Sequence, residues 1–212
     1  MTNGVYSVDY KIGEISLTNL KKLNLYYYTL SEAFKNLQNS SLKNCSFSIE
    51  GFIDYNKDNF SDVINEMRKV MIVGLYHLWE KDIKTLLLND VNNQSISAKK
   101  IEQWSFGDIV SLFKFVSDDT KHFIDIFDLI KKYSTLTNAI KHGEGNAMNK
   151  LKNGYPEFIS RKTSDIFIEE VHLQEFYETL VQFWESNPDS IVFDYEGFKN
   201  ATKWNGEKIR YI

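Results

Sequence analysis

The chain has 212 residues, of which 42% are hydrophobic, and its formal net charge at pH 7 is −4. This length and apolar content suffice for one domain with a sizeable core, and the acidic balance argues against a protein that coats nucleic acid with its whole surface. The amino-terminal stretch lacks the basic start and apolar core of a secretory signal, and the longest apolar run, Val70 to Tyr76, is far shorter than the about 20 residues that cross a bilayer. We therefore expect a cytoplasmic protein that does not enter a membrane.

The chain contains a single cysteine, Cys45, so it cannot form an internal disulfide. No spacing of Cys and His residues is typical of a zinc site. Because no His or Asn/Asp motif accompanies Cys45, we expect it to fill space rather than to act as a nucleophile. The sequence thus predicts neither a metal nor a cofactor.

The first half of the chain predicts two helices. Residues 20–37 have a helical pattern with several aromatic side chains, whereas residues 46–55 alternate enough for a short extended segment. Asn59 or Ser61 is expected to cap a second helix that runs to about Asn89. Around its middle this helix is apolar on nearly every side, so its centre should be buried among other helices.

One face of this second helix carries polar side chains. His77, Glu80 and Lys84 follow one another at helical spacing. We expect an ion pair between Glu80 and Lys84, which are four residues apart, and we expect His77 to pack in the core. Neither expectation gives these residues a catalytic role.

The second half begins with a helical pattern over residues 98–115 that is broken near Ser105 and Gly107. The clearest helix of the chain follows at residues 120–142. Asn146 is then expected to cap a short basic helix that ends before Pro156. These signals continue the all-helical pattern of the first half.

The remaining residues predict an extended segment at 163–168 and an amphipathic helix at 170–186. The aromatic residues of the tail should dock on the body of the protein. The fold we expect is an all-α bundle of about five to seven helices with minor extended segments. It should form a single domain of residues 1–212 with N- and C-terminal elaborations.

The helix at residues 120–142 combines an apolar stripe with a polar one. Lys131, Thr135, Asn138 and His142 fall on one narrow polar stripe beside the buried face. Gly143 follows, where a residue free to adopt positive φ ends a helix well. The buried face is expected to contain Phe123, Ile126, Phe127, Ile130, Tyr133 and Ile140.

Residues 131–162 form a basic stretch in an acidic chain. Seven cationic residues against two acidic ones give this stretch a net charge of +5, so the remainder carries −9. A local anion site and a solvated lysine face both fit this pattern. The charged residues are Lys131, Lys132, Lys141, Lys150, Lys152, Arg161 and Lys162 against Glu144 and Glu157.

A histidine beside cations has the chemistry that metal-independent RNA cleavage needs. His titrates near pH 6.5 and exchanges a proton at neutral pH, while a cation stabilises charge that develops on phosphate. The ribose 2′-OH supplies the nucleophile. His142 with Lys141, Lys131 or Lys132 would provide both groups. Alternatively, Lys141 and His142 are only helix-end cations that favour the helix dipole.

The segment LTNAIKHGEG, residues 136–145, resembles the hallmark segment of HEPN domains, a helical family found in toxin and antiviral systems. The family motif is an Arg followed after four to six residues by His. Three further segments, YHLWEKDIKTLL, NKLKNGYPEF and QFWESNP, resemble a bacterial HEPN-like subgroup, so the likeness extends from about Tyr76 to Pro188. It implies a homodimeric metal-independent endoribonuclease of a bacterial defence or toxin-antitoxin module.

On this resemblance the signature His corresponds to His142, and the polar residue that usually follows the Arg corresponds to Asn138. The resemblance and the polar stripe together predict His142 and Lys141 as catalytic residues. Asn138, Lys131 and Thr135 are the predicted substrate-binding residues.

The chain departs from the family at the Arg, because Thr137 occupies that position and faces the apolar stripe. For an active nuclease, a lysine such as Lys141 would have to substitute for the Arg, although lysine lacks the planar fork of arginine. The alternative is a noncatalytic dimeric interaction or sensor module that has lost RNase activity and works with a partner protein from a neighbouring gene.

Overall fold

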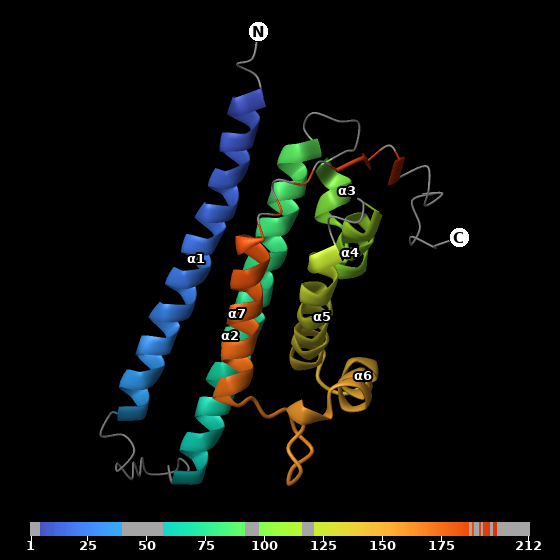
Figure 1. Cartoon of the computed structure of the whole chain (residues 1–212). Coiled ribbons are helices and arrows are strands. Elements are labelled where there is room, and N and C mark those ends of the chain that lie inside the picture. The colour runs from blue at the N-terminus through green and yellow to red at the C-terminus, as the bar shows by residue number, and fades with distance from the viewer. Residues whose placement is uncertain are drawn as a thin grey trace. The chain divides into compact units, whose positions relative to one another are not determined.

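The computed structural model describes residues 5–39, 57–91, 98–115 and 121–186, together with positions 188, 191, 193–195 and 197–198. Within these residues the fold is all-α (Figure 1), and the named elements are seven α-helices and one 3₁₀ helix, with no named strand. Beyond α7, Pro188 has 3₁₀ conformation, and Tyr195, Gly197 and Phe198 are α-helical. The helices are α1 (Val5–Asn39), α2 (Lys57–Val91), α3 (Ala98–Glu102), α4 (Phe106–Phe115), α5 (Lys121–His142), α6 (Asn146–Gly154), η3 (Pro156–Phe158) and α7 (Glu170–Glu185). The expected all-α bundle is thus confirmed, while the expected extended segment at residues 46–55 lies outside the described residues.

The chain divides into two compact units. Unit 1 comprises Met1–Lys21, His77–Lys131 and Thr179–Ile212, and unit 2 comprises Lys22–Tyr76 and Lys132–Glu178. Each of α1, α2, α5 and α7 contributes residues to both units. None of the described helices combines the length and the apolar content that a bilayer crossing needs.

Aromatic side chains dominate the core of unit 1. The Trp79 and Phe183 ring centroids are 5.6 Å apart, and Phe113 lies 4.9 Å from Phe127 and 5.1 Å from Phe193. Edge-to-face pairs of this kind add about 0.5–1.5 kcal/mol each beyond the burial of their area. Because Phe193, Tyr195 and Phe198 of the tail are all buried, docking of this part of the tail is confirmed.

Several helix boundaries differ from the predicted ones. α1 begins at Val5, well before the predicted start at residue 20. This start was missed because Ser16 and Asn19, which are buried there, are polar and do not mark an apolar stripe in the sequence. α2 begins at Lys57, so neither Asn59 nor Ser61 caps it. The N-cap of α6 is Gly145, with φ of 106°, rather than Asn146.

A local cap explains the break between α3 and α4. The Ser105 backbone N–H donates to Asp108 Oδ2 at 2.7 Å, and the Asp108 N–H donates to Ser105 Oγ at 3.3 Å. This reciprocal pair satisfies two of the N–H groups that a helix start leaves without an intrahelical acceptor. The predicted interruption near Ser105 is therefore confirmed, and it lies at the start of α4.

In unit 2, two side chains of α2 hold the segment that precedes α7. Asn65 Nδ2 donates to the Ile166 carbonyl at 2.9 Å, and the Ile168 N–H donates to Asn65 Oδ1 at 2.8 Å. Arg68 Nη1 donates to the Ile168 carbonyl at 3.1 Å. The side chains of Ile166 and Ile168 are buried, so this segment is fixed by both packing and hydrogen bonds.

Replacing Asn65 with Ala is expected to lower the free energy of unfolding by about 1–2 kcal/mol, because it leaves one N–H and one carbonyl of a partly buried segment unpaired. Urea denaturation followed by circular dichroism measures the change. Asn149→Ala, at an exposed position of α6, is the matched control and should leave the midpoint unchanged. Equal midpoints for the two variants would contradict the expected role of Asn65.

Candidate functional site

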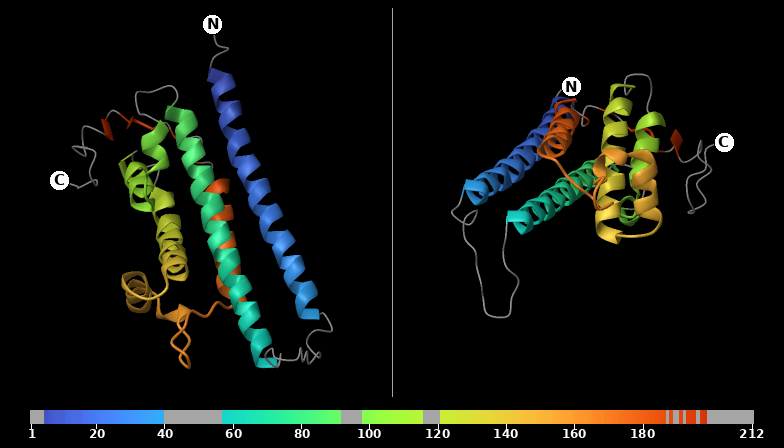
Figure 2. Two further views of the ribbon diagram at one scale, coloured as in Figure 1. Left: turned by 180° about the vertical axis from the view of Figure 1, so that it is seen from behind. Right: turned by 90° about the horizontal axis from the view of Figure 1, so that it is seen from below.

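Unit 2 contains an open groove of about 1840 Å³. Its lining comes from the first turns of α2, the end of α5, α6, the loop after η3, and the start of α7. Figure 2 shows, from behind and from below, that α6 lies beside the carboxyl-terminal end of α5. The groove is thus formed where several short elements follow one another at the end of α5.

The loop between η3 and α7 is a short hairpin, which we call the arm (residues 159–166). Its base is an isolated antiparallel bridge between Ile159 and Ile166. The Ser160 N–H donates to the Asp165 carbonyl at 2.8 Å, and Ser164 adopts a left-handed φ of 62° at the turn. The expected extended segment at residues 163–168 is therefore limited to the bridge at Ile166.

A polar network that joins α5 to η3 and α7 lies in the same unit. Lys132 Nζ lies 2.8 Å from Glu175 Oε2 and 3.4 Å from Glu157 Oε1. The Tyr133 hydroxyl lies 2.5 Å from Glu175 Oε2 and 2.6 Å from the His172 carbonyl. Lys132 is thus paired with two carboxylates, so it is not a free cation for the charge-stabilising role that the sequence offered it beside His142.

The network shifts the pKa of two of its members in opposite directions. Burial raises the pKa of the Tyr133 hydroxyl, and the adjacent Glu175 carboxylate raises it further. Burial alone would raise the pKa of Glu175, but hydrogen bonds from Lys132 and Tyr133 outweigh burial and lower it. The network therefore combines a neutral phenol with an ionised carboxylate at neutral pH.

His172 is the histidine that lines the groove. Its Nδ1 accepts the Glu169 N–H at 3.2 Å, and its ring packs edge-on against Phe158 at 4.9 Å. Burial lowers the pKa of His172, so a neutral ring with the proton on Nε2 is favoured. No motif in the sequence around His172 marks it as a functional residue, so its place in the groove was not predicted.

The predicted site residues lie on the surface of α5 and do not line the groove. Asn138, Lys141 and His142 are exposed, and none of the three has a side-chain hydrogen bond or ion pair with another described residue. Thr135 is half-buried, and Lys131 is exposed and belongs to unit 1. The catalytic and substrate-binding roles of all five residues stay predictions.

Thr137, at the position of the signature Arg, is sealed inside the protein. Only 1% of its surface is exposed, and its Oγ1 is buried without a hydrogen-bond partner among the described residues. The expectation that Thr137 faces the apolar stripe is confirmed. No cation therefore stands at this point of the helix, and an Arg side chain there would have to enter the core.

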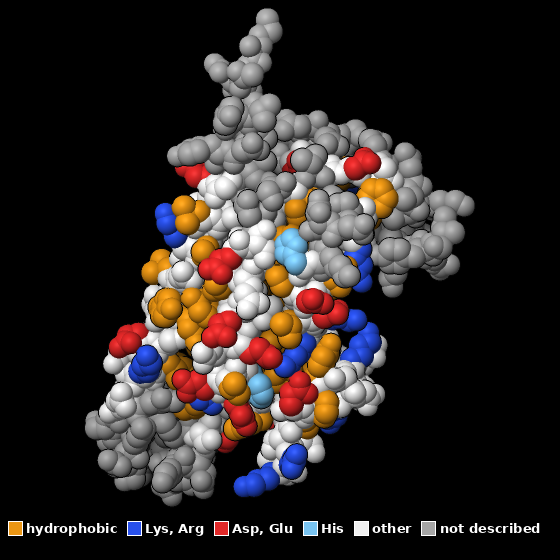
Figure 3. Space-filling view, viewed as in Figure 1, with side chains coloured by type: hydrophobic (Ala, Val, Ile, Leu, Met, Phe, Trp, Pro, Cys, Tyr) orange, Lys and Arg blue, Asp and Glu red, His pale blue; other side chains and the backbone are white. Residues whose placement is uncertain are grey.

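In the part of unit 2 from Lys132 to Glu178, five cationic residues are exposed and form no ion pair with any described residue. We call them the basic surface: Lys141, Lys150, Lys152, Arg161 and Lys162. They come from the end of α5, from α6 and from the tip of the arm. Figure 3 shows Lys and Arg side chains at this tip. These five cations are free to bind an external anion, unlike Lys132.

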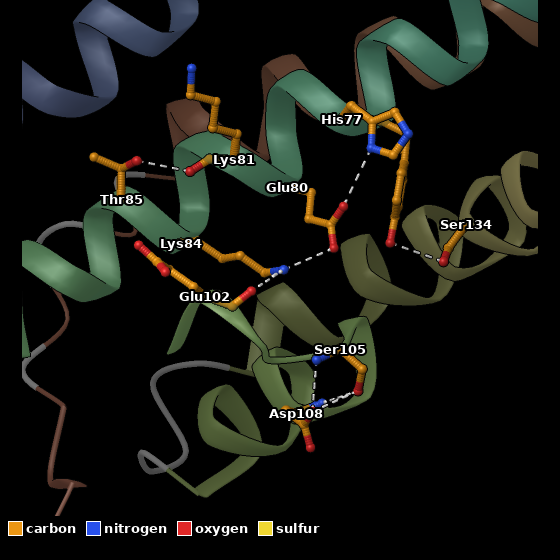
Figure 4. A network of polar contacts seen from close by, with 10 residues as sticks. His77, Glu80, Lys81, Lys84, Thr85, Glu102, Ser105, Asp108 and Ser134 are labelled. Atoms are coloured by element: carbon orange, nitrogen blue, oxygen red, sulfur yellow. Dashed lines mark hydrogen bonds and ion pairs between the residues drawn. The ribbon is translucent and has the colours of Figure 1, made fainter. Parts of the chain in front are cut away.

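Unit 1 carries a separate polar cluster on α2 (Figure 4). Glu80 Oε1 lies 3.1 Å from Lys84 Nζ, which confirms the predicted pair, and Glu80 Oε2 lies 3.5 Å from His77 Nδ1. The expectation that His77 packs in the core is wrong, since 44% of its side chain is exposed. The described residues contain no group of three or more His, Cys, Asp or Glu side chains arranged to hold a metal ion.

Glu175→Gln is expected to lower the free energy of unfolding by about 1 kcal/mol at neutral pH, because it removes a carboxylate that two donors share at a partly exposed site. The folded pKa of Glu175 lies below the ordinary 4.5, so its stabilisation is complete above pH 4.5 and is lost as the pH falls through the folded pKa. The difference between wild type and variant should therefore shrink on acidification below pH 4.5.

Urea denaturation of both proteins at neutral pH and at two acidic pH values tests this expectation. Glu185→Gln, at an exposed position of α7, controls for the loss of a surface charge. A difference between wild type and Glu175→Gln that is the same at every pH would contradict it.

Comparison with known proteins finds no match to the chain: no family model, no curated protein and no solved structure. The resemblance to HEPN domains therefore rests on the segments named above and stays a prediction. The function has to be inferred from the geometry of unit 2.

Proposed function

We propose that this protein is an HEPN-like module of a bacterial defence or toxin-antitoxin system that binds RNA through the basic surface of unit 2 without cleaving it. The observation that supports binding is the set of five exposed cations that no carboxylate of the described residues neutralises. Phosphates attract such cations, and the release of condensed counterions favours the complex.

The charge of the rest of the chain confines RNA to this surface. The net charge of −4 includes the five cations, so all other residues together carry −9. An acidic remainder repels a polyanion, whereas the end of α5, α6 and the tip of the arm attract it. Because the attractive surface is this small, it would contact only one short stretch of an RNA chain.

The buried, uncharged side chain of Thr137 supports a protein that binds RNA but does not cleave it. The family motif has a cation at this position, and here the side chain is buried and uncharged. Lys141 is exposed one turn further along α5 and lacks the bidentate geometry of an Arg. The homodimer and the partner protein from a neighbouring gene stay predictions.

The triple variant Lys152→Gln, Arg161→Gln, Lys162→Gln is expected to weaken RNA binding at least tenfold and to reduce the slope of log affinity against log salt by about 2, since each lost contact to single-stranded RNA removes about 0.7. Fluorescence anisotropy with a labelled RNA over a salt series measures both quantities. The triple variant Lys21→Gln, Lys81→Gln, Lys114→Gln changes three exposed lysines of unit 1 and should bind like wild type. Equal losses in the two triple variants would contradict a localised RNA site.

A metal-independent endoribonuclease that uses His142 is the second candidate function. His142 and Lys141 are exposed as the last two residues of α5, and the next residue, Gly143, lines the groove. RNA held on the basic surface would lie within reach of both side chains. An imidazole with Lys141 beside it would then supply the proton transfer and the charge that cleavage through the ribose 2′-OH requires.

Incubation of the purified protein with tRNA and mixed RNA in EDTA distinguishes the two candidates. Binding without cleavage predicts intact RNA with wild type and with His142→Ala. The nuclease predicts cleavage by wild type that His142→Ala lowers by at least a hundredfold. Cleavage that persists in His142→Ala would point to a contaminant or to another residue.

A further inference from the structure

We propose that the groove of unit 2 binds single-stranded RNA, with one unpaired base stacked on Phe167 and the adjoining phosphates held by Arg161 and Lys162. This inference rests on the proposed function and specifies the form of RNA that the same surface recognises. Three features of the groove carry it: an exposed aromatic ring, a preorganised cationic turn and an uneven distribution of charge.

Phe167 is an exposed ring on a fixed backbone. It lines the groove and is 38% exposed, whereas its neighbours Ile166 and Ile168 are buried. Its N–H donates to the Phe158 carbonyl at 2.9 Å, and its ring contacts no other aromatic ring of the described residues. A ring held this way can stack on any base, a contact worth about 1–3 kcal/mol.

The turn of the arm carries two cations, Arg161 and Lys162, a few residues before Phe167 in the sequence. Ser160 Oγ accepts the N–H groups of Lys162 and Thr163 at 3.3 and 3.4 Å, and the Ser164 N–H donates to the Ser160 carbonyl at 2.9 Å. The backbone of the turn is thus ordered, while the side chains of Arg161 and Lys162 are exposed. Little conformational freedom of the backbone is lost when this turn binds phosphate.

Charge in the groove orients a bound strand. The acidic residues Asp62 and Glu66 come from α2, and Glu169 directly precedes α7. Glu157 of η3 also lines the groove, but its carboxylate pairs with Lys132 at 3.4 Å. The free cations come from α6 and the arm, although the arm also carries Asp165. Phosphates are therefore favoured along α6 and the tip of the arm, and base edges are favoured toward α2 and α7.

The acidic side of the groove suits base edges because exocyclic amino groups are hydrogen-bond donors. Glu66 already pairs with Lys69 at 2.6 Å, whereas Asp62 and Glu169 form no ion pair with a described residue. His172, which favours the neutral state, adds no charge there. The bases of a duplex are stacked and paired, so they cannot turn their faces toward Phe167; only an unpaired strand can.

Phe167→Leu tests the stacking contact, because it keeps an apolar side chain of similar reach and removes the ring. We expect the variant to bind a labelled short oligo(A) strand about 5- to 100-fold more weakly than wild type, with an unchanged salt slope. Phe167→Trp should bind at least as tightly as wild type. Val171→Ala, at an exposed apolar position of α7, should have no effect. Wild type should bind the strand more tightly than an RNA duplex of equal length.

Thermal denaturation confirms that each variant is folded before binding is compared. Wild-type affinity for oligo(A) in Phe167→Leu, together with weakened binding in the basic-surface triple variant, would overturn the stacking contact and leave RNA binding intact. A preference of wild type for the duplex would overturn single-strand recognition. Failure of wild type to bind either RNA would overturn the proposed function and this inference with it.

Discussion

The hydrogen bonds between the Asn65 amide and the backbone of Ile166 and Ile168 are the constraint on which the groove of unit 2 depends. They join α2 to a segment about a hundred residues further along the chain, and the side chains of that segment are buried at the same place. Fixing this segment positions the arm on one side of it and the start of α7 on the other. The exposed ring of Phe167 lies between two anchored neighbours for the same reason.

In the part of the chain that the structure describes, some cations of the basic stretch are paired with carboxylates and others are free. Lys132 lies between Glu157 and Glu175 and packs over the rings of Tyr133 and Phe158, so it stabilises unit 2. The five residues of the basic surface have no such partners among the described residues. A net charge counted along the sequence adds both kinds together, whereas only the second kind is available to an anion. This division makes the proposed RNA contact both local and sensitive to salt.

The helices were largely predictable because their signals are local. The apolar stripe of α5 and the glycine after it predicted a helix that ends at His142, and the structure confirms that end. Prediction failed where burial does not require apolar residues, as at Ser16 and Asn19 of α1. It also failed at the start of α6, where backbone conformation makes Gly145 the cap although Asn146 has the better capping side chain.

The sequence by itself determined the all-α fold, the end of α5 and the inward orientation of Thr137, because the helical spacing of α5 places Thr137 within its apolar stripe. Only the tertiary structure decided that Lys132 is paired, that His172 and Phe167 line a groove, and that His77 is exposed. These outcomes depend on which residues meet after the chain has packed. Asn65 and Ile166, separated by 101 positions, have no local signal that links them, so their contact and the groove beside it appear only in the folded chain.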